Sequence, residues 1–512
     1  MNILKSSIIY SFFTSISRIF GFLRDIFIAN FLGTGLLADI FFVAFRFPNT
    51  FRRIFSEGAL NSAFVPIYTK LVNENLTYEA QKFAGNILII FFLSALFLVV
   101  LIEIFMPNFI RLIAPGFSND ASKFEELVRV SRIIFPFLIF ISISSIYSSI
   151  LNSNNKFALS AALPIILNIT LILSIIIAFY NSKNYLTFLA WGVVLGGILQ
   201  VIILYLSLLR AKINISFSFN FLNSYTKRFT NLFSASFFSS GLLQINVLIG
   251  TIIASFESGA ISYLYYADRI YQLPLALIGI AIGIALLPSI SSKIKKENQE
   301  NINQTIEETL IYALLFSIPA SIGIFVLSDQ IVSTLFERGE FDQNSTVYTS
   351  NALKYYSYGL VAFIIMKIYT PIFFAYENAK PTLYITALNL ILNTILGIIL
   401  FMSIGFVGIA IATSLSAWIS VILLHFNLKR NNYFKMSSKM IKPIVVIISA
   451  SFLMYLYLYN VSKYISEISD FSQYNEIISL VFSVISSILL YLILISFYKP
   501  FKYSEIKNIL KK

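Results

Sequence analysis

Long apolar segments separated by short polar breaks run along the chain from residue 7 to residue 498. Each is close to the length of about 20 residues that a helix needs to cross the hydrocarbon core of a bilayer. Stretches such as Ile87 to Ile102 and Ile165 to Phe179 are apolar on all sides, whereas the strands of a membrane barrel alternate apolar and polar positions. The pattern therefore predicts an all-α polytopic membrane protein.

These segments predict about fourteen transmembrane helices. The expected spans are residues 7–30, 36–66, 83–106, 127–151, 158–180, 185–209, 228–255, 260–290, 306–328, 347–376, 381–402, 405–427, 441–459 and 474–498.

Composition agrees with a membrane protein, because 58% of the residues are hydrophobic and only 12% are charged, against about 25% charged in an average soluble protein. A soluble enzyme is thereby excluded. The net charge of +13 is scattered through the short breaks and forms no block, so we do not expect a nucleic-acid partner. The chain has no cysteine, and we find no phosphate-binding loop, histidine pair for a metal or GxSxG motif. A transporter is expected rather than an enzyme.

The distribution of lysine and arginine predicts the orientation. With the amino terminus inside, 22 basic residues of the breaks face the cytoplasm and 5 face the opposite side, as the positive-inside rule requires, and both termini are cytoplasmic. The first apolar segment carries Arg18, Arg24 and Asp25 and lacks a small-residue cleavage site, so it is expected to be a retained helix rather than a signal peptide. The basic residues on the opposite side are Arg111, Lys123, Lys183, Arg338 and Lys463.

An internal repeat relates two parts of the chain. Residues Ile28 to Lys70 contain a Phe-Pro pair and end at a cytoplasmic lysine, and residues Ile253 to Lys293 contain a Leu-Pro pair and end in the same way. We therefore predict two pseudo-repeated six-helix lobes around a central cavity, residues 1–215 and 216–432. Two C-terminal helices and a cytoplasmic tail follow in residues 433–512.

Transporters built from such repeats hold their substrate between the lobes near the membrane midplane, at broken helices. Glycine and proline inside the predicted helices indicate where hinges or breaks lie. These positions are Gly21, Pro48, Gly58, Pro274, Gly279 and Gly283.

Charged residues inside the predicted helices point to the site, because a charge at the bilayer centre costs about 2.5 to 3.5 kcal/mol and usually faces a cavity. Arginine exceeds the acids there, which favours an anionic ligand, since guanidinium groups match phosphate oxygens in bidentate geometry. Pairing with acids or snorkelling explains Arg46, Arg53, Arg129 and Arg132 more simply. The substrate-binding candidates are Arg18, Arg24, Arg52 and Arg269, and the gating or ion-pair candidates are Asp25, Asp39, Arg53, Glu57 and Asp268.

Several strings of residues together resemble the MurJ/MviN lipid II flippases of the MOP exporter superfamily. They include Ser17-Arg18, Gly21 to Asp25, Phe45 to Asn49, Arg52 to Ala59 and Tyr265 to Arg269, with Phe336 to Gly339 further on. The resemblance covers most of the chain. The arginines of the family motifs fall at Arg18, Arg24, Arg52 and Arg269, the same four that charge balance selects.

The resemblance implies a V-shaped central cavity and an activity. A protein of this family carries undecaprenyl-pyrophosphate-linked glycopeptide, lipid II, to the outer leaflet of the bacterial cytoplasmic (inner) membrane for peptidoglycan and cell-wall synthesis. The last two helices are expected to form a groove for the lipid tail. Lipid II and membrane lipids are the expected partners, no cofactor is expected, and a monomer suffices because the repeat forms the cavity within one chain.

Sodium coupling is doubtful from the sequence. Some family members coordinate sodium with carboxylates at positions that here are Gly250 and Asn393, so Asn389, Asn393 and Thr413 remain as weak oxygen ligands. The membrane potential is an alternative energy source, since moving one charge across it is worth about 2.3 kcal/mol per 100 mV.

Three alternatives to a lipid II flippase stay open on this sequence. A flippase for another lipid-linked oligosaccharide would suit the arginines equally well. A MATE-like multidrug or cation antiporter should carry acids in excess where this chain carries arginine. A membrane-embedded glycosyltransferase needs acidic residues in loops, and the outer loops offer only one compact charged cluster, Glu337, Arg338, Glu340 and Asp342.

Overall fold

The computed structural model describes residues 3–54, 59–181, 184–221, 223–294, 299–468 and 473–498. These residues form helices and connecting segments, with no strand among them. The chain packs as two compact units, which are described separately. Unit 1 comprises Met1–Ser262 with Arg338–Phe341, and unit 2 comprises Tyr263–Glu337 with Asp342–Lys512.

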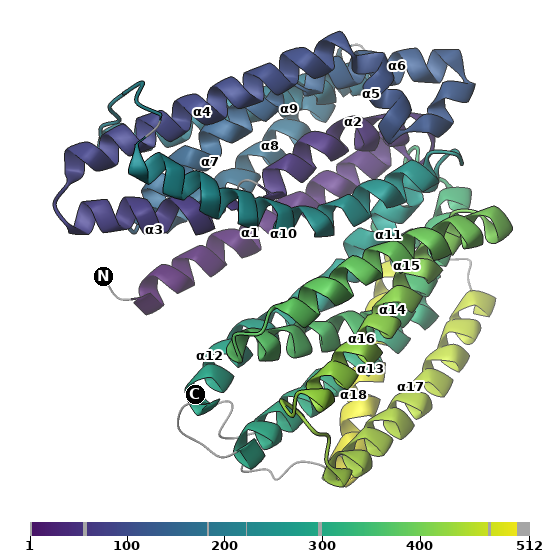
Figure 1. The fold of residues 1–512 in the computed structure, drawn as a ribbon. Coiled ribbons are helices and arrows are strands. Elements are labelled where there is room, and N and C mark those ends of the chain that lie inside the picture. The colour runs from purple at the N-terminus through teal and green to yellow at the C-terminus, as the bar shows by residue number, and fades with distance from the viewer. Residues whose placement is uncertain are drawn as a thin grey trace. The chain divides into compact units, whose positions relative to one another are not determined.

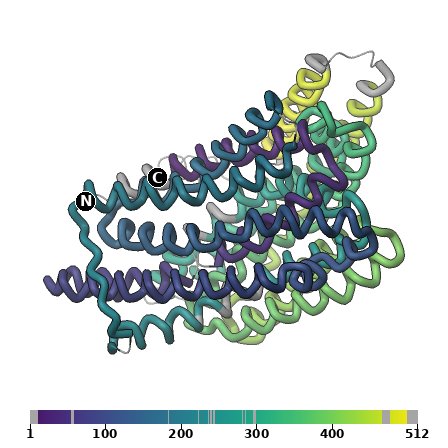
Figure 2. Tube along the Cα trace, turned by 90° about the horizontal axis from the view of Figure 1, so that it is seen from above, coloured from purple at the N-terminus to yellow at the C-terminus, as the bar shows by residue number. Residues whose placement is uncertain are grey.

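Unit 1 is a helical bundle whose long helices run side by side (Figures 1 and 2, purple to teal). Helix α1 packs on α8, α8 on α9, and α7 on both α4 and α9. Its helices are α1 (Ile3–Leu32), α2 (Leu36–Arg52), α3 (Leu60–Asn73), α4 (Thr77–Ile104), α5 (Met106–Ile113), α6 (Ala121–Ile134), α7 (Phe137–Ser153), α8 (Phe157–Tyr180), α9 (Tyr185–Arg210), α10 (Ser224–Ala254) and the start of α11 (Ala260–Pro274).

Unit 2 continues from α11 and is built around α13, α14 and α16. The last two helices, α17 and α18, pack on α13 through a cluster that includes Leu327, Ile447 and Tyr491. The Tyr491 hydroxyl donates to the Leu315 carbonyl at 2.8 Å. The elements are a π-helical turn at Leu275–Ile280, α12 (Ala281–Ile294), α13 (Gln299–Phe336), α14 (Gln343–Ala375), α15 (Lys380–Ile404), α16 (Val407–Arg430), α17 (Ile441–Ile468) and α18 (Gln473–Tyr498).

Aromatic side chains fill much of the unit 1 core. Phe64 on α3 stacks on Phe83 of α4 with ring centroids 5.2 Å apart, and Phe83 meets Phe229 of α10 edge-on. These rings are almost fully buried. Such pairs contribute about 0.5–1.5 kcal/mol beyond the area they bury, so they hold α10 against α3 and α4.

The predicted all-helical membrane fold is confirmed. Each of the fourteen expected spans coincides with one described helix or with consecutive helical elements, and ten helical segments among the described residues are long and apolar enough to cross a membrane. The expected spans that fall outside those ten correspond to α1, α2–α3, α10 and α11–α12. Three of these four carry the candidate site residues, because the charges that suggest a site also lower the hydropathy of its helices. The total of fourteen spans stays a prediction.

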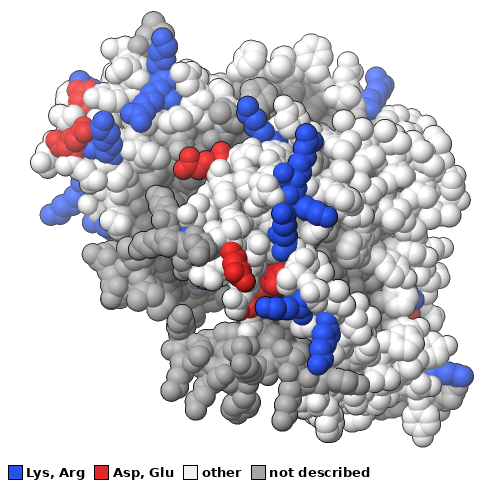
Figure 3. Space-filling model, turned by 60° about the horizontal axis from the view of Figure 1, so that its bottom comes forward, with Lys and Arg blue, Asp and Glu red and all other residues white. Residues whose placement is uncertain are grey.

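Apolar side chains cover the surfaces that would meet lipid. On α15 they include Ile391, Ile395, Ile399 and Met402, which are 51% to 81% exposed. Figure 3 shows one face of the molecule, on which the charged side chains gather in groups between wide uncharged areas. A bilayer is the solvent that makes such a surface stable, since no water is needed to satisfy the helical backbone.

Packing divides the chain at a different place from the predicted repeat. Helix α10, which the repeat assigns to the second lobe, packs on α2, α3, α4 and α5 of unit 1, and the boundary between the compact units lies at Ser262–Tyr263. The repeat describes similarity of topology, whereas the units describe side-chain packing. The lobes at residues 1–215, 216–432 and 433–512 therefore stay predictions.

Candidate functional site

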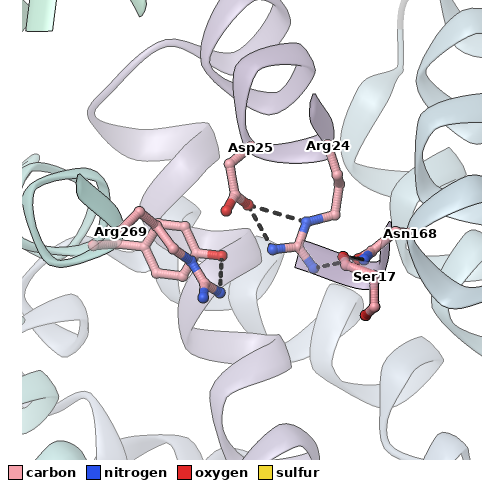
Figure 4. Close-up of polar contacts among 6 residues, drawn as sticks. Ser17, Arg24, Asp25, Asn168 and Arg269 are labelled. Atoms are coloured by element: carbon pink, nitrogen blue, oxygen red, sulfur yellow. Dashed lines mark hydrogen bonds and ion pairs between the residues drawn. The ribbon is translucent and has the colours of Figure 1, made fainter. Parts of the chain in front are cut away.

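A buried ion pair lies on α1 of unit 1. The Arg24 side chain donates from Nε and Nη2 to Oδ1 of Asp25, at 3.0 and 2.5 Å, and the two residues are 7% and 1% exposed (Figure 4). Arg24 is eight residues before the end of α1 at Leu32, about 12 Å along the axis. Two opposite charges are thus held inside the bundle, where an unpaired charge would be far more costly.

Asn168 of α8 completes the hydrogen bonding of Arg24. Its Oδ1 accepts from Arg24 Nη1 at 3.0 Å, and its Nδ2 donates to the Ser17 carbonyl at 3.3 Å (Figure 4). Gly21 lies between these contacts on α1, and a Cβ added there would be 3.3 Å from Asn168 Nδ2. Helix α1 is continuous through Gly21, so in this conformation the glycine makes room for Asn168, and its role as a hinge stays a prediction.

The other two candidate arginines of unit 1 differ in exposure. Arg18 is exposed on α1, and no hydrogen bond or ion pair is found for it within the described ranges. Arg52, in the last turn of α2, is half-buried and donates from Nε to Asn49 Oδ1 at 3.0 Å. Arg53 follows in π-helical backbone. Glu57 and Gly58 lie outside the described residues.

In unit 2, Arg269 lies on α11 beside an aromatic partner. Its Nη2 donates to the Tyr265 hydroxyl at 2.7 Å, and its guanidinium carbon is 4.7 Å from the centroid of the same ring (Figure 4). The Asp268 carboxylate accepts from the Gln272 amide one turn later. Both bonds join residues four apart, which face each other on a helix, so contacts within α11 help to orient the two charges.

Asp39 joins the starts of α2 and α11 by reciprocal caps. Its carboxylate, on a residue 2% exposed, accepts from the backbone N–H of Gly259 at 2.7 Å and of Ser262 at 2.8 Å. The Ser262 hydroxyl in turn accepts from the Gly35 N–H at 3.1 Å. The Asp39 carboxylate thus accepts hydrogen bonds from backbone N–H groups at the start of α11, where helical N–H groups have no acceptor within the helix. We expected Asp39 to pair with an arginine. In this conformation its carboxylate binds backbone N–H groups instead.

Irregular backbone follows both prolines that were predicted to mark breaks. After Pro48 in α2, residues 53, 54 and 59 are π-helical, and after Pro274 the π-helical turn Leu275–Ile280 begins directly. Proline removes a helical hydrogen bond, and π-helical turns are frequent at functional sites. Gly283 beyond the second turn lets α12 approach α14, since a Cβ there would be 2.9 Å from the Lys367 carbonyl oxygen.

The weak sodium candidates lie on α15 and α16 of unit 2. The Asn389 amide donates to the Ser420 hydroxyl at 2.8 Å, and the Thr413 hydroxyl donates to the Ile409 carbonyl of its own helix. Asn393 is buried. In the part of the chain that the structure describes, no group of three or more histidine or acidic residues could hold a metal ion.

Sequence reasoning missed three residues of this arrangement: Asn168, Tyr265 and Ser262. Asn168 carries the one amide side chain in the mostly apolar sequence from Ile165 to Phe179, a signal that could have marked it. Tyr265 could have been found from its spacing of four to Arg269. Ser262 has no comparable signal, because its partners Gly35 and Asp39 are more than 200 positions away in sequence.

Comparisons with known proteins agree on one family. A family model described as lipid II flippase MurJ matches residues 28–482. A probable lipid II flippase MurJ from Rhizobium tropici is 37% identical over 437 residues, covering 85% of this chain and 82% of that protein. A probable lipid II flippase MurJ from Rickettsia prowazekii (strain Madrid E) is 38% identical over 428 residues, 83% of each chain.

Solved structures show the same fold. A lipid II flippase MurJ in an inward closed conformation matches with a TM-score of 0.82 at 30% identity, over 96% of this chain and 99% of that one. An inward-facing multidrug resistance transporter of the MATE family, in the MOP superfamily, matches with a TM-score of 0.67 at 15% identity, over 83% and 98%. The second likeness concerns the fold alone.

Proposed function

Because the chain belongs to the lipid II flippase MurJ family, we propose that it moves lipid II from the inner to the outer leaflet of the bacterial cytoplasmic membrane by alternating access. Lipid II is the peptidoglycan precursor linked to undecaprenyl pyrophosphate. The observation that carries the proposal is the buried Arg24–Asp25 pair on α1, which sets a phosphate-binding side chain inside an apolar bundle.

The pyrophosphate is held by arginine. Arg18, Arg24 and Arg52 of unit 1 and Arg269 of unit 2 are its ligands, because guanidinium groups stay charged and bind phosphate oxygens in pairs. Arg24 Nε and Nη2 bind Asp25 in the present conformation, so the pyrophosphate competes with this carboxylate. Asp25 neutralises the charge of Arg24 when the site is empty. When the substrate binds, the Asp25 carboxylate leaves Arg24 and is solvated by water or bound by another donor.

The caps at Asp39 and Ser262 close the outer side. They lie at the α1–α2 turn and at the start of α11, which the predicted orientation places toward the periplasm. The hydrogen bonds of Asp39 to Gly259 and Ser262, and of Ser262 to Gly35, are short-range contacts that either form fully or are lost. Together they act as a two-state latch. Outward opening breaks it, and closure after release restores it.

No cofactor is part of this proposal. The membrane potential drives an anion outward from an inside-negative cell, and the amide and hydroxyl groups of Asn389, Asn393 and Thr413 provide at most a weak sodium site without a carboxylate. The chain acts as a transporter, not as an enzyme. It acts as a monomer, with both termini in the cytoplasm.

Lipid II binding by the purified protein tests the proposal. Replacing any of the four arginines by alanine is expected to weaken binding about tenfold or more, since a hydrogen bond to a charged group contributes roughly 1.5–3 kcal/mol. Native mass spectrometry with lipid II measures the bound fraction. Arg129→Gln is the matched control, because Arg129 is exposed and pairs with Glu126 on its own helix. Alanine variants that bind as well as this control would refute the arginine site.

A further inference from the structure

The segment between α9 and α10, residues 211–221, is fixed against α4 of unit 1. The Ser216 N–H donates to the Gln81 carbonyl at 3.4 Å and its hydroxyl to Gln81 Oε1 at 3.2 Å. The Asn86 amide donates to the Asn220 carbonyl at 2.9 Å. Gly85 permits this approach, because a Cβ there would lie 2.2 Å from the Ser216 carbonyl oxygen. The segment is therefore a positioned strap rather than a loose connection (Figure 1, beside α4).

The strap presents two phenylalanines outward. Its first part is anchored, since Ile213 and Ile215 pack on the unit 1 core. Phe217 and Phe219 are 62% and 79% exposed, whereas Ser216 and Ser218, which alternate with them, are half-buried. Leaving two aromatic rings in water is unfavourable, at about 25 cal/mol per Å² of apolar surface, so this side requires an apolar partner.

Four exposed basic side chains flank the phenylalanines: Arg210 and Lys212 before them, Lys227 and Arg228 after them. The sequence holds no acid from residue 127 to residue 256. The acid on the adjoining turn of α4, Glu79, already pairs with Lys82 at 3.4 Å. The strap therefore carries a net positive charge around its apolar side.

We propose that the strap binds the membrane surface at the α9 end, with its phenylalanines in the interfacial region and its basic residues on anionic lipid headgroups. Arg210 ends a membrane-spanning helix, so the segment starts at the bilayer edge, on the side that the predicted orientation makes cytoplasmic. Each basic residue near an anionic surface contributes about a fivefold preference, and inserted rings add an apolar contribution. The strap is then held by α4 on one side and by lipid on the other.

Single-cysteine labelling tests this in the full-length protein, because the natural chain has no cysteine to remove. A nitroxide is attached to Phe219→Cys and, as a control, to Asn73→Cys, at the exposed last residue of α3. The protein is placed in nanodiscs of phosphatidylcholine, with or without phosphatidylglycerol. Collisions with oxygen and with a water-soluble nickel chelate report the depth of each label.

The label at residue 219 is expected to be shielded from nickel and accessible to oxygen, and to move deeper when phosphatidylglycerol is present. The triple variant Lys212→Gln, Lys227→Gln, Arg228→Gln is expected to lose that dependence on phosphatidylglycerol. A label at residue 219 as accessible to nickel as the one at residue 73 would overturn the proposal. So would a depth that is the same in both lipid compositions.

Discussion

Arg24→Ala is expected to abolish lipid II transport in a cell that depends on this protein. The variant removes the guanidinium that binds Asp25 and Asn168, and breaking a buried ion pair by removing one of its members costs roughly 3–5 kcal/mol. Both the binding of pyrophosphate and the neutrality of the empty site are lost. Lysine is not expected to restore function, because an ammonium lacks the planar fork that spans two acceptors.

Asp25→Asn separates binding from stability. The variant lacks the carboxylate that competes with the pyrophosphate for Arg24. Without ligand it is expected to be less stable than the parent, but lipid II is expected to bind it more tightly. Lipid II should therefore raise the melting temperature of the variant more than that of the parent. Transport is expected to fall, because release no longer has a carboxylate to recapture Arg24. The measurements are growth in a strain lacking its own flippase and thermal unfolding with and without lipid II. If Arg24→Ala supports growth at parental membrane levels, the pair has no role in transport.

Asp39→Ala is expected to have the second large effect. It leaves the Gly259 and Ser262 N–H groups without their buried acceptor, and each such loss costs roughly 1–3 kcal/mol. Asp39→Asn keeps one acceptor oxygen and should be milder. Ser262→Ala, which removes the hydroxyl's bonds to the Gly35 N–H and the Gly259 carbonyl but keeps the Ser262 N–H that binds Asp39, should be milder still.

Hydrogen exchange measures the latch directly. Protection of the amides at Gly259 and Ser262 is expected to fall in the order parent, Ser262→Ala, Asp39→Asn, Asp39→Ala, together with transport. Ser345→Ala, at the start of α14, is a control that removes a hydroxyl bond to the helix cap Asp342 elsewhere. Unchanged protection in Asp39→Ala would show that the caps do not hold the outer side closed.

The helices could be predicted because membrane spans depend on local sequence. An apolar segment of sufficient length forms a helix whatever its neighbours, and every expected span coincides with described helices. The breaks after Pro48 and Pro274 were also predictable, since proline acts on its own turn. Their π-helical form was not, because no local pattern of the sequence encodes it.

The sequence indicated which residue types form the candidate site better than it indicated which of these residues bind each other. The sequence marks Arg24 as a binding candidate and Asp25 as an ion-pair candidate without pairing them, and in the structure Asp25 binds its neighbour Arg24. Asp39 binds amides far away in sequence, a contact that no local pattern encodes. Charge balance and the family motifs select the same four arginines, and their roles in binding stay predictions.

Outer-leaflet lipid II in a bacterium depleted of its own flippase tests the central claim most directly. The parent protein is compared with Arg24→Ala and Arg269→Ala at matched membrane levels, and lipid II exposed on the outer leaflet is quantified. We expect the parent to restore exposed lipid II and both variants to fail. A well-expressed parent that leaves lipid II on the inner leaflet, or that restores a different lipid-linked glycan instead, would contradict the account.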